Sequence, residues 1–347
     1  MNADGGTSVI AVIPAHNEER GIVDTITSLR NQTVRVNRVV VISDNSTDST
    51  VDLAREAGAE VYETTDNTFK KAGALNQVLD ILIPDLRESN MVFAIDADTS
   101  LGPSFVNDSL NLMIRRPEVG AVGGVFVGRE PNNILELAQS NEYVRYMRQI
   151  DRSGKTMVLS GTAAMIRVKA LRQVKEHRGT YYDNTALTED MEIGLVLKTL
   201  GWKLASPISC RATTDLMPTL KDLHNQRVRW YRGAFENLRS YGLTKVTLAY
   251  WGQQLMLGWS VLMMGLYLSL TSVALVLGGI TFNPLWAAVG FIFWLERLVT
   301  AWKNGWKGRL LAVVIIPELC YDIFLQWAFI KALYLSLRKT NAVWHHA

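Results

Sequence analysis

Short apolar segments alternate with segments of helical periodicity over the N-terminal part of the chain. Strands are predicted at residues 8–15, 38–45, 59–65 and 91–98, where apolar and β-branched residues run together. Helices are predicted between them at residues 18–30, 48–57 and 71–83, with Ser46 or Thr47 placed to cap the second. Strands that alternate with helices in this way predict a parallel, doubly wound α/β sheet.

The pattern is more mixed after residue 100. Helices are predicted near residues 103–115 and from residue 132 to about residue 151, and strand-like segments at residues 119–128 and 157–168. The stretch "TEDMEIGLVLKTLG" predicts a helix over residues 188–201, with Thr188 as N-cap and Glu189 and Asp190 in the first turn. A last helix, residues 219–240, carries "QRVRW" and leads into an apolar region.

This apolar region predicts contact with a membrane. No Asp, Glu, Lys or Arg occurs between Val246 and Leu295, and residues 255–278 alone could cross a hydrocarbon core of about 30 Å. A second candidate span, residues 285–302, follows a "TFNP" turn, and tryptophans suited to the interface accompany it: Trp286, Trp294, Trp302 and Trp306. The third segment, residues 310–337, could lie in the interface or bend back, because it contains Pro317, Glu318, Asp322 and Lys331. A buried helical hairpin in a soluble oligomer is the alternative.

Basic residues flank the first two candidate spans. Those before the first span are Lys221, Arg227, Arg229, Arg232, Arg239 and Lys245, and those after the second are Lys303, Lys307 and Arg309. Both ends of the hairpin, and the N-terminal domain, are therefore expected on the cytosolic side. The start of the chain lacks the basic and apolar regions of a signal peptide. Cys210 and Cys320 lie far apart and outside any CxxC pattern, which favours a reducing compartment.

The composition is that of a globular protein, with 48% hydrophobic and 20% charged residues among 347. A formal net charge of +3 is too small to indicate a nucleic-acid partner. Neither G-x-G-x-x-G nor G-x-x-x-x-G-K-[ST] occurs, which argues against dinucleotide and P-loop sites. With so small a net charge, an acidic ligand would be bound by groups close to it and not by the overall charge of the protein.

Polar residues follow three of the predicted strands. The stretches "PAHNEE", "SDNSTDST" and "DAD" offer acids and amides to one crevice, because ligands bind doubly wound sheets at the carboxyl ends of strands. Asp96 and Asp98 could hold Mg²⁺ or Mn²⁺ while the phosphates of a diphosphate complete the coordination shell. The alternative is an ordinary strand exit, where Asp is a common turn former.

Two helices carry further candidate chemistry. Asp190 could accept the proton of an attacking hydroxyl, or it could only favour the helix dipole. Gln226, Arg229 and Trp230 share one helix face, which places an amide, a guanidinium suited to a diphosphate and an indole suited to a sugar ring side by side. The alternative for "QRVRW" is a basic face that meets lipid headgroups.

In this order, the motifs resemble those of the family 2 glycosyltransferases of the GT-A fold, in particular the membrane-embedded branch with cellulose, hyaluronan and poly-N-acetylglucosamine synthases. The resemblance covers roughly residues 8–233. "IPAHNE" is similar to the nucleotide-binding loop, "SDNSTDST" to the uracil-side acidic loop, "KAGALN" to the phosphate-side loop and "DAD" to the metal-binding D-x-D. "SGTA" is similar to the acceptor-side loop, "TED" to the catalytic base motif and "QRVRW" to the Q-x-x-R-W signature.

The resemblance implies a role for each matching position. Nucleotide-sugar contacts fall on Pro14, Asn17, Glu18, Asp44, Lys71, Asn76 and Asp96, with Glu18 and Asp44 on the nucleoside and Lys71 on the diphosphate. The metal falls on Asp96 and Asp98, the catalytic base on Asp190, and acceptor or diphosphate contacts on Gly161, Thr162, Glu189, Gln226, Arg229 and Trp230. Many relatives have Asp-Asp where this chain has Asp44-Asn45, which affects base recognition but leaves the diphosphate site intact.

The resemblance implies an inverting, metal-dependent glycosyltransferase that takes a UDP-hexose or UDP-N-acetylhexosamine to a lipid, protein or glycan acceptor at the cytosolic membrane face. The expected organisation is a GT-A domain at residues 1–217, an interfacial helix at 218–245, membrane-associated helices at 246–339 and a tail at 340–347. Polymer synthases have more membrane helices, so a single copy is not expected to form a polymer channel. A membrane-anchored binding module is the alternative; it would need no base at Asp190. A nucleotidyltransferase would leave "TED" and "QRVRW" without a role. The oligomeric state is left open.

Overall fold

The computed structural model describes residues 7–154, 156–278 and 284–338. Two compact units make up the chain, the first from Met1–Pro131 and Tyr146–Leu216 and the second from Asn132–Arg145 and Met217–Ala347. Residues 281–283 of the predicted "TFNP" turn and the predicted tail at residues 340–347 lie outside the described residues.

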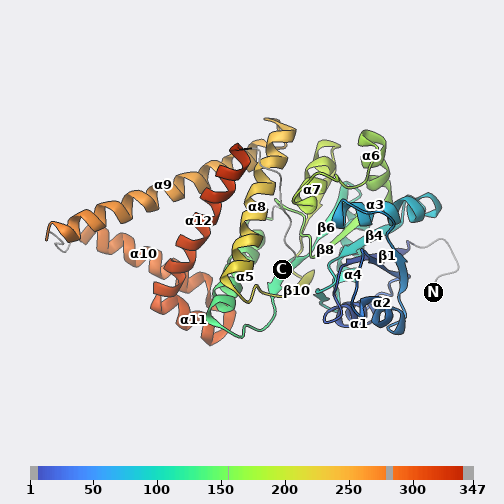
Figure 1. The fold of residues 1–347 in the computed structure, drawn as a ribbon, viewed down its shortest axis with the longest axis horizontal. Coiled ribbons are helices and arrows are strands. Elements are labelled where there is room, and N and C mark those ends of the chain that lie inside the picture. The colour runs from blue at the N-terminus through green and yellow to red at the C-terminus, as the bar shows by residue number, and fades with distance from the viewer. Residues whose placement is uncertain (1–6, 155, 279–283, 339–347) are drawn as a thin grey trace. The chain divides into compact units, whose positions relative to one another are not determined.

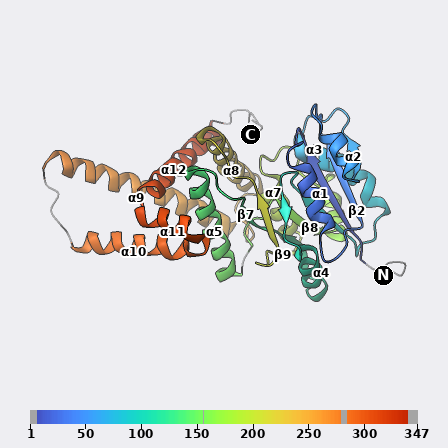
Figure 2. The same cartoon turned by 90° about the horizontal axis from the view of Figure 1, so that it is seen from below.

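The first unit is an α/β structure with a seven-stranded sheet in the order β3-β2-β1-β4-β8-β6-β9 and a three-stranded sheet in the order β5-β10-β7 (Figure 1). The strands are β1 Val9–Ala15, β2 Arg38–Ser43, β3 Glu60–Glu63, β4 Met91–Ile95, β5 Ser100–Leu101, β6 Val119–Gly123, β7 Val125–Gly128, β8 Ala163–Arg167, β9 Lys203–Ala205 and β10 Arg211–Thr214. The helices are α1 Ile22–Arg30, α2 Thr50–Glu56, α3 Lys70–Leu82, α4 Phe105–Arg115, α6 Val168–Arg178 and α7 Glu189–Thr199, together with the end of α5 Ile134–Ser153. Helices α1, α2 and α4 lie on one side of the large sheet, and α3, α6 and α7 lie on the other (Figures 1 and 2).

The predicted parallel sheet is only partly correct. Strands β3, β2, β1 and β4 are parallel, but β8 is antiparallel to both of its neighbours, β4 and β6. The chain reaches β8 through β7 and the long helix α5 rather than through a single crossover helix, so the rule for parallel crossovers does not apply there. The strand-like segment predicted at residues 119–128 is divided into β6 and β7, which belong to different sheets.

The cap predicted for the second helix is wrong. Helix α2 begins at Thr50, and its N-cap residue is Ser49 rather than Ser46 or Thr47. The two predicted residues instead hold the preceding loop, because the Ser46 hydroxyl accepts a hydrogen bond from the Asn17 amide and the Thr47 amide donates to the Asn17 side chain. Helix α1 likewise begins later than predicted, at Ile22.

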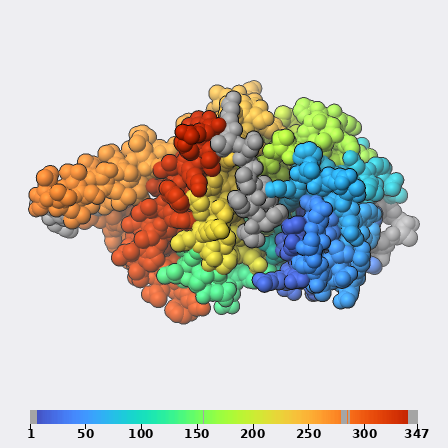
Figure 3. Space-filling view, viewed as in Figure 1, coloured from blue at the N-terminus to red at the C-terminus, as the bar shows by residue number. Residues whose placement is uncertain are grey.

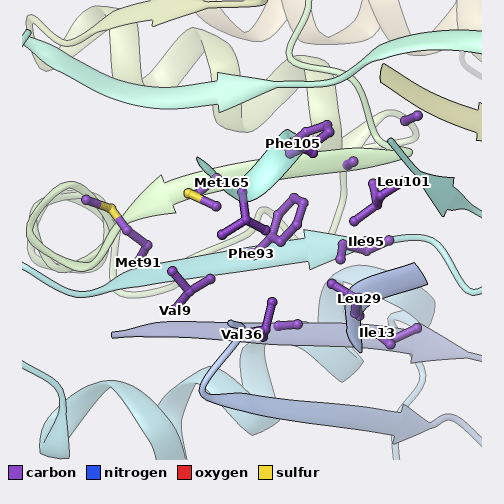
Figure 4. Packing of buried hydrophobic residues seen from close by; sticks show 14 of the residues in the cluster. Val9, Ile13, Leu29, Val36, Met91, Phe93, Ile95, Leu101, Phe105 and Met165 are labelled. Carbon is purple, nitrogen blue, oxygen red and sulfur yellow. The ribbon is translucent and has the colours of Figure 1, made fainter. Parts of the chain in front are cut away.

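Side chains that alternate along the central strands form a core on each face of the large sheet. Val9, Ile13 and Phe93 point to the side of α1 and α4, where a continuous buried cluster contains them (Figure 4). The rings of Phe93 and Phe105 stack there with centroids 5.0 Å apart. Burial on both faces keeps the strands in register and fixes where their carboxyl ends lie.

The second unit is helical and consists of the start of α5 together with α8 Leu220–Tyr241, α9 Leu248–Val276, α10 Pro284–Thr300, α11 Gly305–Val314 and α12 Ile316–Leu337. Helix α12 packs along α8, where Phe329 contacts the rings of Tyr231 and Phe235. Helix α9, coloured orange, stands out from the yellow and red helices of the same unit (Figure 3). Its most apolar window has no residue buried within the structure.

Among the described residues, α9 is long and apolar enough by itself to cross a membrane. The second predicted span corresponds to α10, which has 17 residues. The third predicted segment is divided into α11 and α12, which meet at an angle of 84° next to Ile315, whose φ is 56°. If this bent pair counts as one span, the described chain has up to two.

Charged residues inside the second unit pair with one another. Glu318 on α12 is 2% exposed and accepts hydrogen bonds from Asn141 at 2.6 Å and Arg145 at 3.1 Å. Arg227 on α8, also 2% exposed, donates to Glu142 at 2.8 Å. Arg227 is therefore an internal ion-pair partner, which corrects its use as a flanking basic residue in the orientation argument.

Candidate active site

The loops after β1 and β2 are fastened to each other. Asn17, in the left-handed region with φ 56°, accepts a hydrogen bond from the Thr47 amide at 2.8 Å and donates its own amide to Ser46 at 3.2 Å. The His16 Nδ1 atom lies 2.6 Å from the Asp44 carbonyl oxygen. These contacts join two of the predicted strand exits into one rim.

Acidic side chains gather at this rim and at the end of β4. Burial, followed by Asp98 and Asp96, raises the pKa of Glu18 to about 7. Burial, followed by Asp96 and Asp215, raises the pKa of Asp98 to about 6. Among the described residues, the carboxylate of Asp98 has hydroxyl partners, Thr99 at 3.1 Å and Thr214 at 3.4 Å, and no Lys or Arg. The Arg129 guanidinium donates to the backbone carbonyl of Asp98 at 3.1 Å, so the carboxylate itself has no direct cationic partner among the described residues.

This donor set fits a hard divalent cation. In the part of the chain that the structure describes, no group of three or more His, Cys, Asp or Glu side chains is arranged to hold a metal ion. Mg²⁺ and Mn²⁺ do not require such a group, because they are held by one or two carboxylates and take the remaining oxygens from phosphate and water. Burial and the neighbouring acids Asp96 and Asp215 raise the pKa of Asp98. A cation beside Asp98 would stabilise its carboxylate against both effects.

Lys71, in the first turn of α3, connects two parts of the site. Its Nζ atom lies 2.6 Å from Asp96 Oδ1, 2.8 Å from Glu189 Oε1 and 3.5 Å from the Gly161 carbonyl oxygen. Burial lowers the pKa of the Lys71 ammonium, but Asp96 and Glu189 outweigh it and hold that pKa well above its ordinary value. Lys71 thus remains charged at the end of β4, next to the first turn of α7.

Asp190 lies against the loop that precedes β8. Its Oδ2 atom accepts a hydrogen bond from the Gly161 amide at 3.1 Å, and its Oδ1 atom accepts one from the Met191 amide at 2.7 Å. A Cβ atom at position 161 would lie 3.0 Å from Asp190 Oδ2, so a larger residue there would press on the carboxylate. The neighbouring Thr162 carbonyl accepts from the Asp96 amide at 3.0 Å, so this loop contacts both the D-x-D segment and Asp190.

Asn76 and Pro14 hold structure around the site. The Asn76 side chain donates to the Tyr182 carbonyl at 2.8 Å and accepts from the Tyr182 amide at 2.9 Å. Pro14 lies within β1, in register with Ile42 of β2. Their predicted contacts with a nucleotide sugar stay predictions.

Two residues near the site were not predicted from the sequence. Burial raises the pKa of Tyr146, on α5, to about 12, and the charge of Asp190 contributes to this rise. Thr214 at the end of β10 reaches Asp98. No motif marks either residue, because β10 comes from the second, smaller sheet and Tyr146 sits in the middle of a long helix.

The residues of "QRVRW" lie on α8 in the second unit. The guanidinium of Arg227 lies 4.4 Å from the centroid of the Trp230 ring. One face of the ring predicted to bind a sugar therefore contacts an internal cation. The Gln226 Oε1 atom is buried and has no hydrogen-bond partner among the described residues. The roles predicted for Gln226, Arg229 and Trp230 are not tested by these contacts.

Comparison with known proteins finds similarity to glycosyltransferases. Residues 10–175 match the family described as Glycosyl transferase family 2. The chain is 27% identical over 250 residues to a probable glucomannan 4-beta-mannosyltransferase 3 of Oryza sativa subsp. japonica, covering 67% of this chain and 44% of that protein. It is 25% identical over 241 residues to the poly-beta-1,6-N-acetyl-D-glucosamine synthase of Staphylococcus epidermidis, covering 65% and 54%. The chain thus spans about half the length of these curated relatives.

A solved structure matches nearly the whole chain. The mannosyltransferase PcManGT from Pyrobaculum calidifontis, in complex with GDP-Man and Mn²⁺, aligns with a TM-score of 0.64 over 97% of this chain and 91% of that one. At 17% sequence identity, this likeness shows the fold. The first unit therefore has the GT-A fold that the order of motifs predicts.

Proposed function

We propose that the chain, of which residues 10–175 match glycosyl transferase family 2, transfers a sugar from a nucleotide sugar to a hydroxyl acceptor. The observation that carries this proposal is the arrangement around Gly161. Its carbonyl lies 3.5 Å from the Lys71 ammonium and its amide donates to Asp190 at 3.1 Å. A cation suited to a diphosphate and a carboxylate suited to a hydroxyl proton thus both contact the backbone of one residue.

Asp190 acts as the general base in this proposal. Its carboxylate accepts the proton of the acceptor hydroxyl, and the freed oxygen attacks the anomeric carbon opposite the departing diphosphate. A single displacement of this kind inverts the anomeric configuration. The Gly161 and Met191 amides orient the two carboxylate oxygens before the acceptor arrives.

Lys71 and the D-x-D carboxylates serve the donor. The Lys71 ammonium binds the leaving diphosphate. Asp96 and Asp98 would hold Mg²⁺ or Mn²⁺, which when bound neutralises charge on the diphosphate. Glu18 and Asp44, on the rim formed by the first two strand exits, contact the nucleoside. For the acceptor and diphosphate side we propose Gly161, Thr162, Glu189, Gln226, Arg229 and Trp230.

The donor is a UDP- or GDP-activated hexose or N-acetylhexosamine. The prediction from sequence is a UDP-sugar, whereas the name of one relative and the ligand of the similar structure add mannosyl donors and GDP-Man to the candidates. Both nucleotides should be tested, because this chain has Asp44-Asn45 where many relatives have Asp-Asp.

We also propose that the enzyme works at a membrane, with its catalytic unit on the cytosolic side. The support is α9, with 29 residues, a mean hydropathy of 1.8 in its best window and no burial of that window. On α11, Trp306 is 69% exposed and Leu310 is 54% exposed, next to Lys307. Exposed apolar and basic residues together are typical of helices at a lipid surface.

The decisive experiment incubates purified protein with UDP- and GDP-sugars and Mn²⁺ and analyses the products by mass spectrometry. Release of UDP or GDP together with a glycosylated acceptor supports transfer. Binding of a nucleotide sugar without any turnover, in extracts of lipid, protein and glycan acceptors, would instead favour the binding module. Fractionation tests the membrane proposal separately, because full recovery of the chain in a detergent-free supernatant would contradict it.

A further inference from the structure

The ammonium of Lys71 contacts two carboxylates. Binding a diphosphate requires the positive charge of Lys71 but explains neither of these contacts. Asp96 Oδ1 lies at 2.6 Å and Glu189 Oε1 at 2.8 Å. Asp96 belongs to the D-x-D segment, so its oxygens have a second use in the proposed function. Glu189 is among the proposed acceptor and diphosphate contacts, but the proposed chemistry gives it neither a proton to accept nor a metal to hold.

Glu189 is also costly to keep in this position. Its side chain is 9% exposed, and a carboxylate removed from water destabilises a fold unless it is paired. A helix-dipole role for an acid in the first turn of α7 does not require burial, since such interactions operate at exposed helix ends. The short distance to Lys71 is the feature that distinguishes Glu189 from an ordinary first-turn acid.

We propose that Glu189 is a positioning residue that keeps the Lys71 ammonium beside the donor diphosphate while Asp96 serves the divalent cation. This inference rests on the proposed function. Lys71 occupies Oδ1 of Asp96, and a bound cation draws charge from the same carboxylate. The ammonium then needs a second anionic contact to keep its place, and Glu189 supplies it from the other side.

The Gly161 carbonyl adds a third, weaker contact at 3.5 Å. With Glu189 and Gly161 in place, the ammonium is held from the α7 side even when its bond to Asp96 weakens. Without the Glu189 charge, Asp96 is the only carboxylate partner of Lys71 among the described residues. The ammonium would then lie closer to Asp96, where it competes with the cation and reaches the diphosphate less well.

This proposal and a simple charge effect predict opposite results. Replacing Glu189 by a neutral residue removes a negative charge near a negatively charged ligand, so a general electrostatic effect would strengthen diphosphate binding. Loss of positioning would weaken it. The sign of the change therefore separates the two explanations.

The experiment measures the affinity of the full chain in detergent for UDP and for GDP by calorimetry at saturating Mn²⁺. We expect Glu189→Gln to weaken binding of the preferred nucleotide by about tenfold, which corresponds to about 1.4 kcal/mol. Glu189→Asp is the matched variant, because it keeps the charge but shortens the side chain by one methylene. It should weaken binding as well if reach to Lys71 matters.

The Lys71→Met variant tests whether Glu189 acts through Lys71. In that background Glu189→Gln should cause no further loss of nucleotide affinity, whereas a structural role of Glu189 would add its own loss. Unchanged or tighter binding by Glu189→Gln would overturn the inference while leaving the proposed function intact. If the wild-type chain binds neither UDP nor GDP, the proposed function and the inference both fail. Should Glu189→Gln not fold, wild-type affinity in Glu189→Asp would overturn the inference.

Discussion

Replacement of Asp190 by asparagine is the sharpest test of the proposed base, and the structure sets the size of its side effects. Both carboxylate oxygens accept backbone N–H groups, from Gly161 at 3.1 Å and from Met191 at 2.7 Å. Asparagine offers one accepting oxygen and an NH₂ group, so one of these N–H groups would face a donor. A donor left unpaired in this partly buried position costs up to about 1–3 kcal/mol.

This cost is larger than loss of a helix-dipole interaction, which is at most about 1 kcal/mol at an exposed helix end. It remains below the total stability of a typical domain, about 5–15 kcal/mol, so Asp190→Asn should fold. The thermal midpoint should fall by about 2–4 °C for each kcal/mol lost. Loss of a general base should lower the rate of transfer by about 10²–10⁴. That corresponds to about 2.7–5.5 kcal/mol in the activation barrier.

The assay is single-turnover transfer with saturating donor and acceptor, combined with calorimetry of donor binding and thermal unfolding of the same preparation. Asp52→Asn is the matched control, because Asp52 is an acid in the first turn of α2 and has no part in the site. We expect Asp190→Asn to lose transfer and keep donor affinity, and the control to keep both. Transfer near the wild-type rate would refute the assignment of Asp190 as base. Lost donor binding would show that Asp190 shapes the donor pocket instead.

Three further predictions follow from contacts in the two units. Asp98→Ala, or an excess of EDTA with the wild-type chain, should abolish transfer, because the diphosphate would lose its cation; full activity in EDTA would contradict the metal proposal. Gly161→Ala should lower the transfer rate more than donor affinity, since the added Cβ would lie 3.0 Å from Asp190 Oδ2 and push the carboxylate away; equal losses in kinetics and calorimetry would count against this. Glu318→Ala should destabilise the helical unit by about 3–5 kcal/mol, because Arg145 and Arg297 would lose a buried partner. Unfolding in detergent measures this loss, and a smaller loss than that of Glu296→Ala would contradict the prediction.

The first half of the sheet could be predicted from sequence because its strands are short, uninterrupted apolar runs that end in polar loops. Strands β1, β2 and β4 follow this pattern, and burial enforces it. The edge strand β3 has exposed glutamates at both ends and is less buried. The direction of β8 could not be predicted in the same way. Direction depends on the path of the chain through β7 and α5, and the apolar pattern of a strand is the same read in either direction.

The chemistry of single loops was accessible from sequence, but the links between loops were not. "DAD", "KAGALN" and "TED" are each visible as motifs, whereas the contacts of Lys71 with Asp96 and Glu189 join residues far apart in the chain. Arg227 shows the opposite error. Its place in a basic stretch suggested an exposed charge, but helical periodicity turns it toward Glu142, where it is buried.

Whether the groups of a helix are exposed or paired within the second unit also indicates which helix would enter a membrane. In α12 the charged residues of the third predicted segment have partners within the second unit: Glu318 pairs with Arg145, and Asp322 pairs with Arg297 at 2.5 Å. Its aromatic residues also pack on α8. The most apolar window of helix α9 has no residue buried within the structure, and burying its apolar surface would contribute roughly 25 cal/mol for each Å² removed from water. If the enzyme works at a lipid bilayer, α9 is therefore the element that must enter it, and α12 can stay with the helical unit.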